Sequence, residues 1–256
     1  MKHIIITLIA VAVLLSACGG PAPTTPPPTD VPTAIPTEAP TNTIAPAPTV
    51  TVIPSATPNP LLFRDDFEGA LDAGWAWTRE NKKSWSLTNN PGWLEIMARP
   101  GGVADTMENV LLRPAPEGNF EIEIKLNFRP VENFQIAGVV IYESAANFIQ
   151  FGRAFCGFTP EPCVGDGFYI DNMAGGGMNP ENFSTAAPAV DVVYLRFRRE
   201  GSIYTAYASE DGTTWQVIGS HNNGMTPMFV GLVSGQAYQT VPKPAQFDYF
   251  LINSLP

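Results

Sequence analysis

From residue 61 onward, short runs of alternating apolar and polar residues follow one another along the chain. Alternation is strict over residues 120–126, where every second side chain from Phe120 to Leu126 is apolar. Successive side chains of a strand point to opposite faces, so this segment is expected to have one buried and one wet face. The same pattern predicts strands at residues 93–98, 120–128, 134–143, 147–154, 192–199, 203–209 and 229–233.

Turn residues separate these runs, and no window of eleven or more residues has a helical period. Such turns lie at residues 91–92, 101–102, 116–118, 200–201, 211–212 and 223–224. Many strands at this spacing without helices between them indicate a sandwich or barrel. We therefore expect residues 61–256 to form one all-β domain.

Two hairpins are predicted from local sequence. Strands 192–199 and 202–208 flank the pair Glu200 and Gly201, and a second turn is centred on Asp211 and Gly212. Glycine adopts the positive φ that such turns require. Asp211 can accept hydrogen bonds from backbone N–H groups of its own turn.

The first 17 residues are predicted to be a secretory leader. Lys2 and His3 precede an apolar run, residues 4–15, that is too short to cross a hydrocarbon core about 30 Å thick. Residues 15–19 (LSACG) resemble the lipobox of bacterial lipoproteins, in which the cysteine is lipidated and becomes the mature N-terminus. The resemblance implies that Cys18 carries a lipid anchor. The alternative is an ordinary cleavage site with an incidental cysteine.

Residues 18–60 are predicted to be a disordered stalk. Residues 19–60 include thirteen Pro and ten Thr, no aromatic residue, and two charges, Asp30 and Glu38. Such a segment cannot bury enough apolar surface to offset the entropy of ordering, and its proline content favours extended polyproline II. We expect a spacer between membrane and domain, whose threonines are candidates for O-glycosylation.

The charge composition limits which classes of binding partner are expected. The formal net charge is −10, with 14 Lys and Arg against 24 Asp and Glu. Phosphate binding needs clustered basic residues, so nucleic-acid binding and polybasic attachment to anionic lipid are not expected. Membrane contact is therefore expected through the lipid anchor alone.

The chain resembles the concanavalin A-like β-sandwich at the C-terminus of β-xylosidases and arabinofuranosidases of glycoside hydrolase family 43. The segments that carry the resemblance are 66–68 (DFE), 75–80 (WAWTRE), 85–88 (WSLT), 91–96 (PGWLEI), 109–113 (NVLLR), 135–142 (QIAGVVIY), 194–201 (YLRFRREG) and 247–250 (FDYF). The resemblance implies a two-sheet antiparallel jelly-roll sandwich with a carbohydrate-related role. It implies no catalytic site.

Catalytic candidates are few. Glu121 and Glu123 share one face of a predicted strand, as the acid and nucleophile of a glycosidase would, but Lys125 continues that face. We interpret the pair as part of a solvated surface. His221 lies in a predicted turn and is expected at the surface, so the sequence nominates no catalytic residue.

Sugar binding needs aromatic rings together with side chains that hydrogen-bond hydroxyl groups. Trp77, Arg79 and Glu80 combine an aromatic ring with both charge signs inside the resembling region. Tyr142 and Gln150 lie on neighbouring predicted strands and could share one concave face. These residues and Tyr169 are the candidate carbohydrate contacts, and Asp171 is a further available polar side chain. The alternative for each tryptophan is a place in the core.

Cys156 and Cys163 remain once Cys18 is assigned to lipid. Outside the cytoplasm, such a pair predicts a disulfide that closes the intervening loop, worth about 2 kcal/mol in the chain-entropy model. Free thiols are the alternative.

Several sandwiches of the same superfamily hold a structural calcium where the first and last strands meet. Asp65, Asp66 and Asp248 are the matching acids in this chain, and carboxylate oxygens suit this hard cation. The resemblance thus implies a structural calcium; the alternative is ordinary turn and edge carboxylates.

Together these patterns predict a monomeric, extracytoplasmic lipoprotein whose sandwich binds a polysaccharide or cell-surface glycan without catalysis. A structural or protein-interaction domain without sugar affinity is the second hypothesis, and a glycoside hydrolase is the third.

Overall fold

A computed structural model of the protein describes residues 59–158, 163–179, 181, 183–236 and 242–256. The predicted leader, Cys18 and the stalk up to residue 58 lie outside the described residues. No helix long and apolar enough to cross a membrane occurs in the part of the chain that the structure describes.

The described residues form strands and no helix. The strands are β1 (Leu61–Asp65), β2 (Ala76–Thr78), β3 (Trp85–Ser86), β4 (Leu94–Pro100), β5 (Val110–Pro114), β6 (Phe120–Asn127), β7 (Gln135–Ser144), β8 (Asn147–Cys156), β9 (Gly165–Ala174), β10 (Gly177–Met178), β11 (Phe183–Ala186), β12 (Val192–Glu200), β13 (Ile203–Ser209), β14 (Gln216–Asn222), β15 (Phe229–Gln236) and β16 (Lys243–Ser254).

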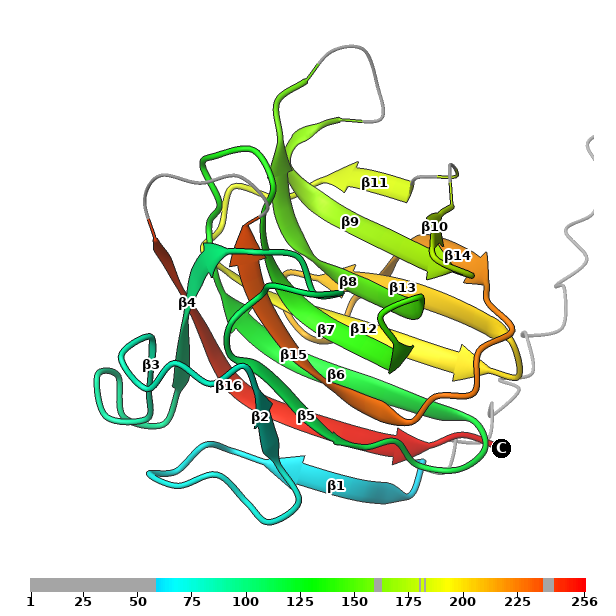
Figure 1. Ribbon diagram of the computed structural model, residues 1–256, viewed down its shortest axis with the longest axis horizontal. Coiled ribbons are helices and arrows are strands. Elements are labelled where there is room, and N and C mark those ends of the chain that lie inside the picture. The colour runs from blue at the N-terminus through cyan, green and yellow to red at the C-terminus, as the bar shows by residue number, and fades with distance from the viewer. Residues whose placement is uncertain (1–58, 159–162, 180, 182, 237–241) are drawn as a thin grey trace, which may run out of the picture. The chain divides into compact units, whose positions relative to one another are not determined.

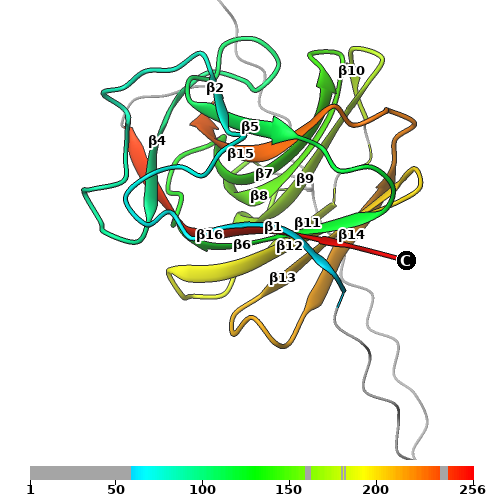
Figure 2. The same ribbon diagram turned by 90° about the horizontal axis from the view of Figure 1, so that it is seen from below.

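These strands make two sheets that lie one above the other (Figures 1 and 2). Sheet 1 has the order β14-β13-β12-β6-β16-β4, with β1 paired to β16 and β3 to β4. Sheet 2 has the order β9-β8-β7-β15-β5-β2, and both β10 and β11 pair with the free edge of β9. Pairing is antiparallel except where the end of β15 meets the end of β4 and joins the sheets. The predicted all-β sandwich is confirmed.

The main core lies between the two sheets and follows from period-2 alternation. In β6, Phe120, Ile122, Ile124 and Leu126 are fully buried. They pack in one cluster with the inward side chains of sheet 2, such as Val139 of β7. Facing sheets of a sandwich bury their inner side chains in this way.

Sheet 2 is apolar on its outer face as well. On β7 and β8, Ile136, Val140 and Phe148 point away from the main core and form a second cluster. Val103 and Met107 reach this cluster from the loop between β4 and β5, residues 101–109. The loop therefore covers part of a face that would otherwise be exposed to water.

Both predicted hairpins are confirmed. β12 and β13 pair antiparallel up to Glu200 and Ile203, and Gly201 in the turn has φ 62°. In the second turn, the Asp211 carboxylate accepts hydrogen bonds from the backbone N–H groups of Thr213 and Thr214, each at 2.7 Å. These bonds hold the pKa of Asp211 well below its usual range.

Arg153 is a buried charge that joins separate parts of the sandwich. Its side chain is fully buried and forms a bidentate pair with Asp166 of β9, at 2.7 and 2.6 Å. The guanidinium also donates to the backbone carbonyls of Pro188, Val190 and Asp191. Arg153 thus fixes the connection between β11 and β12 against β8.

Replacing Gly138 by Ala should destabilise the domain by about 2 kcal/mol or more. A Cβ on Gly138 would overlap the backbone carbonyl of Phe151 and the Cα of Gly152, which faces Gly138 across the β7–β8 ladder. Backbone cannot move aside as a side chain end can, so the strands would separate, and overpacking costs about 1–3 kcal/mol. Urea unfolding measures the loss. Gly224→Ala is the matched control, because a Cβ there meets nothing within 4 Å; equal losses would contradict the argument.

Replacing Asp166 by Ala should cost about 3–5 kcal/mol, because it leaves the Arg153 guanidinium buried without its carboxylate. The double variant Arg153→Met with Asp166→Ala removes both charges and should recover part of that loss. A double-mutant cycle from urea unfolding separates the two effects. Strict additivity of the single changes would show that the pair is not coupled.

Candidate functional site

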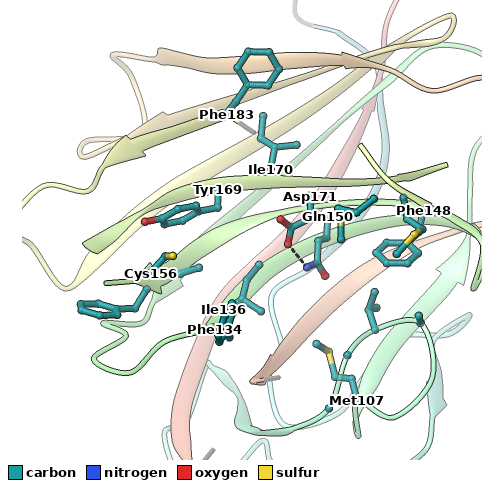
Figure 3. A pocket seen from close by; sticks show the side chains of 18 of the residues that line it. Met107, Phe134, Ile136, Phe148, Gln150, Cys156, Tyr169, Ile170, Asp171 and Phe183 are labelled. Atoms are coloured by element: carbon teal, nitrogen blue, oxygen red, sulfur yellow. Dashed lines mark hydrogen bonds between the residues drawn. The ribbon is translucent and has the colours of Figure 1, made fainter. Parts of the chain in front are cut away.

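A pocket of about 540 Å³ opens on the outer face of sheet 2 (Figure 3). Its floor is formed by side chains of β7, β8 and β9, and the loop after β4 makes one wall. The segment around the Cys156–Cys163 disulfide lies at another side. This volume is within the range of about 300–1,000 Å³ that is usual for small-ligand sites.

Gln150 and Asp171 form a polar pair within this apolar lining. They face each other across the β8–β9 ladder, and the Gln150 amide donates to the Asp171 carboxylate at 2.6 Å. Gln150 is 8% exposed, and its carbonyl oxygen Oε1 has no hydrogen-bond partner among the described residues. Burial raises the pKa of the Asp171 carboxyl. The pair thus leaves one buried acceptor without a partner at the floor of the pocket (Figure 3).

Six aromatic residues and three methionines are among the residues that line the pocket. Phe148 lies beside the polar pair and stacks on Tyr142 with centroids 6.2 Å apart. The Tyr169 ring also lines the pocket, but its hydroxyl donates to the carbonyl of Gly165 at 2.9 Å and accepts from the N–H of Val164 at 3.0 Å. Tyr169 therefore offers mainly its ring to a ligand.

Arg79 supports the pocket without lining it. Its guanidinium donates to the carbonyls of Met107 at 2.6 Å and Val103 at 3.1 Å, both in the wall loop. Gly101 starts this loop with φ 135°, and a Cβ there would strike the backbone of Thr106 at 2.5 Å. The charge predicted to contact a sugar instead holds one wall in place.

Trp77 and Glu80 lie outside the pocket lining. The Trp77 ring packs on Trp85 with centroids 4.8 Å apart, and the indole N–H of Trp85 donates to Glu80 at 3.2 Å. Of the predicted sugar contacts, the structure thus brings Gln150 and Tyr169 into one lining. Tyr142 is not among the lining residues; its ring stacks on that of Phe148.

The sequence names Asp171 only as an available polar side chain and does not pair it with Gln150. It lies in β9, whose first three residues include Gly165 and Gly167. Residues 170–172 are one apolar and two polar residues, Ile, Asp and Asn. The strand shows no clean alternation, and the partner of Asp171 is set by the pairing of β8 with β9. The one sequence signal is that Asp171 lies two residues after Tyr169 and therefore on the same face of the strand.

Cys156 and Cys163 form the predicted disulfide, with their Cα atoms 5.0 Å apart. Both cysteines line the pocket, as does Phe158 between them, which is 52% exposed. The disulfide itself thus lies at the margin of the pocket.

The three acids predicted to hold calcium have other partners. The Asp65 carboxylate accepts from the N–H groups of Phe67 and Asp72 and from the indole of Trp75, at 2.8 to 2.9 Å. Asp66 pairs with Arg64, and Asp248 pairs with Lys125. No group of three or more His, Cys, Asp or Glu that could hold a metal occurs among the described residues. The three carboxylates thus already have partners among the described residues, and calcium binding stays a prediction.

Glu121 and Glu123 lie on the outer face of sheet 1, as the alternation predicts. Arg198 donates to Glu121 at 2.8 Å, and Arg196 donates to Glu123 at 2.7 Å. The hydroxyl of Tyr249 donates to Glu123 at 2.7 Å. Glu121 is nevertheless buried, because the neighbouring side chains cover it. Both carboxylates are thus used in contacts with neighbouring side chains of sheet 1, which suits a structural role.

The prediction that His221 lies at the surface is wrong. His221 belongs to β14, is 2% exposed, and meets Phe183 edge-on with centroids 4.9 Å apart. Neither ring nitrogen has a hydrogen-bond partner in the described structure. Burial lowers the pKa of His221, against the opposing charges of Glu181 and Asp171. The imidazole is thus held neutral between the sheets.

The free energy of unfolding should fall as the pH drops below about 6.5, the unfolded pKa of histidine. Below that value the unfolded chain binds a proton that the buried His221 resists, so acid favours unfolding. Asp171, whose pKa burial raises, works in the opposite direction at lower pH. Urea unfolding at pH 8 and pH 5.5 should show a smaller difference for His221→Phe than for the natural protein. Equal differences would exclude His221 as the cause.

The chain is similar to a known protein family and to several solved structures. The family model for the β-xylosidase C-terminal concanavalin A-like domain matches residues 64–253. No curated protein matches the chain.

Several solved structures share the fold. BlXynB of glycoside hydrolase family 43 from Bacillus licheniformis is 20% identical, with TM-score 0.67 over 75% of this chain and 39% of that one. Xylan β-1,4-xylosidase from Bacillus halodurans C-125 is 22% identical, with TM-score 0.61 over 75% and 39%. The Bacteroides ovatus protein "Xyloglucan PUL GH43B" is 21% identical, with TM-score 0.64 over 80% and 42%.

This chain therefore spans about two fifths of the length of these proteins. The family model covers most of the sequence, in agreement with the resemblance of its motifs and with the two-sheet architecture. The chain belongs to the family of β-xylosidase C-terminal concanavalin A-like domains.

Proposed function

We propose that this domain binds a carbohydrate in the pocket on sheet 2 and does not hydrolyse it. The observation that carries the proposal is the Gln150–Asp171 pair, which places unused acceptor capacity within a lining of rings. A buried acceptor left without a donor costs about 1–3 kcal/mol. A sugar hydroxyl would supply that donor, while the rings contact its C–H faces.

Binding without hydrolysis follows from the count of carboxylates. A glycosidase needs two carboxyl groups on either side of the scissile bond. Asp171 is the one carboxylate among the described residues that line the pocket. Glu121 and Glu123 lie on the other sheet and are paired with arginines.

The family supports a carbohydrate ligand. The similar structures include proteins named for xylan and xyloglucan, and the matched family is named for β-xylosidases. A polysaccharide of this kind is the ligand that we propose for the domain.

The proposed location is outside the cytoplasm, at a membrane surface. A lipid on Cys18 would hold the chain there, and the Pro/Thr-rich residues 19–60 would carry the domain away from the bilayer. The disulfide between Cys156 and Cys163 is in accord with an oxidising compartment.

A protein-interaction domain is the second candidate. The observation in its favour is the exposure of Phe158 and Met178 at the margin of the pocket, 52% and 51% respectively. Exposed apolar side chains beside a hollow can mark a protein contact as well as a ligand site.

Retention of the protein on insoluble xylan and on xyloglucan, measured by pull-down and calorimetry, tests the proposal. Gln150→Met should weaken binding at least tenfold, because it removes the acceptor and the donor to Asp171 while keeping the side-chain volume. Gln216→Met, a matched change at an exposed position of β14, should bind like the natural protein. Absence of retention on a broad polysaccharide array by a folded protein would overturn the proposal in favour of a protein partner.

A further inference from the structure

We infer that the ligand of this pocket is a neutral saccharide that carries an apolar substituent, an aryl or acyl group, and that the substituent occupies most of the pocket. The inference rests on the proposed function, since it specifies the carbohydrate that the same site would take.

The first argument is the chemistry of the walls. The other side chains of the lining are apolar or only weak hydrogen-bond acceptors, among them Met107, Phe134, Ile136, Phe148, Met173 and Met178. Figure 3 shows several of them around the central space that Gln150 faces. Such walls favour a ligand with a large apolar face, because burial of apolar surface contributes about 25 cal/mol per Å².

The second argument is the small number of free polar groups. Tyr169 uses its hydroxyl on the backbone of Gly165 and Val164, so Gln150 and Asp171 are the polar side chains left for a ligand among the described lining residues. A bare sugar carries hydroxyls around its whole ring, and each one buried without a partner costs free energy. Two side chains can satisfy one edge of a sugar, and the rest of the ligand must be apolar.

The third argument is charge. Gln150 Oε1 is an acceptor, and Asp171 adds further acceptor oxygens. No Lys or Arg is among the described lining residues, and Arg79 directs its guanidinium to the carbonyls of the wall loop. A uronate or phosphate would therefore meet oxygen lone pairs without a cation. The saccharide is neutral.

The margin of the pocket suits a substituent of variable shape. Met173 and Met178 are unbranched and adapt to irregular apolar groups. Met178 and Phe158 are about half exposed, so a ligand that reaches the margin would remove them from water.

Calorimetry with methyl and phenyl β-glycosides of xylose and of glucose tests the inference on the whole protein. The phenyl glycosides should bind at least tenfold more tightly than the methyl glycosides. Phenyl β-glucuronide should bind at least tenfold more weakly than phenyl β-glucoside. The double variant Met173→Asn with Met178→Asn replaces two apolar side chains of the lining and should reduce the preference for phenyl glycosides. The control Met228→Asn, at an exposed position outside the pocket, should leave that preference unchanged.

The outcomes separate this inference from the proposed function. Equal affinity for methyl and phenyl glycosides, with polysaccharide retention still lost in Gln150→Met, would overturn the apolar substituent and leave carbohydrate binding standing. Binding of phenol as tight as that of the phenyl glycosides, without retention on any polysaccharide, would overturn the saccharide itself. Preference for the phenyl glycosides that depends on both Gln150 and the methionines would support both.

Discussion

The architecture depends on the burial of sheet 2 from both of its faces. Alternation along β7 and β8 sends one set of side chains into the main core and another set to the outer face, and both sets are apolar apart from a few residues such as Arg153 and Gln150. Water cannot cover an apolar face without cost, so the chain folds the loop after β4 across part of it. The pocket lies between residues of that loop and residues of β7, β8 and β9 (Figure 3).

The supports of the pocket come from distant parts of the chain. Arg79, after β2, holds the carbonyls of the wall loop, and Gly138 with Gly152 lets β7 and β8 approach closely beneath it. On the core side of β8, Arg153 ties β9 and the segment before β12 together. The floor and wall of the pocket are thus held by contacts with distant parts of the chain, while the margin carries exposed methionine and phenylalanine side chains.

The Gln150–Asp171 pair at the pocket floor is informative because burial of polar groups costs free energy. Gln150 and Asp171 satisfy each other only in part, and Gln150 Oε1 remains without a donor. An apolar pair would pack there at lower cost. Membership of a family named for β-xylosidases and the acceptor at the floor are both in accord with the proposed carbohydrate ligand. The apolar walls favour a carbohydrate that carries an apolar substituent.

Much of the fold could be predicted from the sequence, because alternation, turn glycines and paired cysteines are local signals. The strict pattern of β6, the turn at Asp211 and the Cys156–Cys163 disulfide are as expected. The site could be predicted only in part. Gln150, Tyr169 and Asp171 could be named from the sequence. The pairing of Asp171 with Gln150, the role of Arg79 and the burial of His221 depend on which strands pair and which loop crosses them. Alternation states which residues share a face of one strand; only the tertiary structure decides what that face meets.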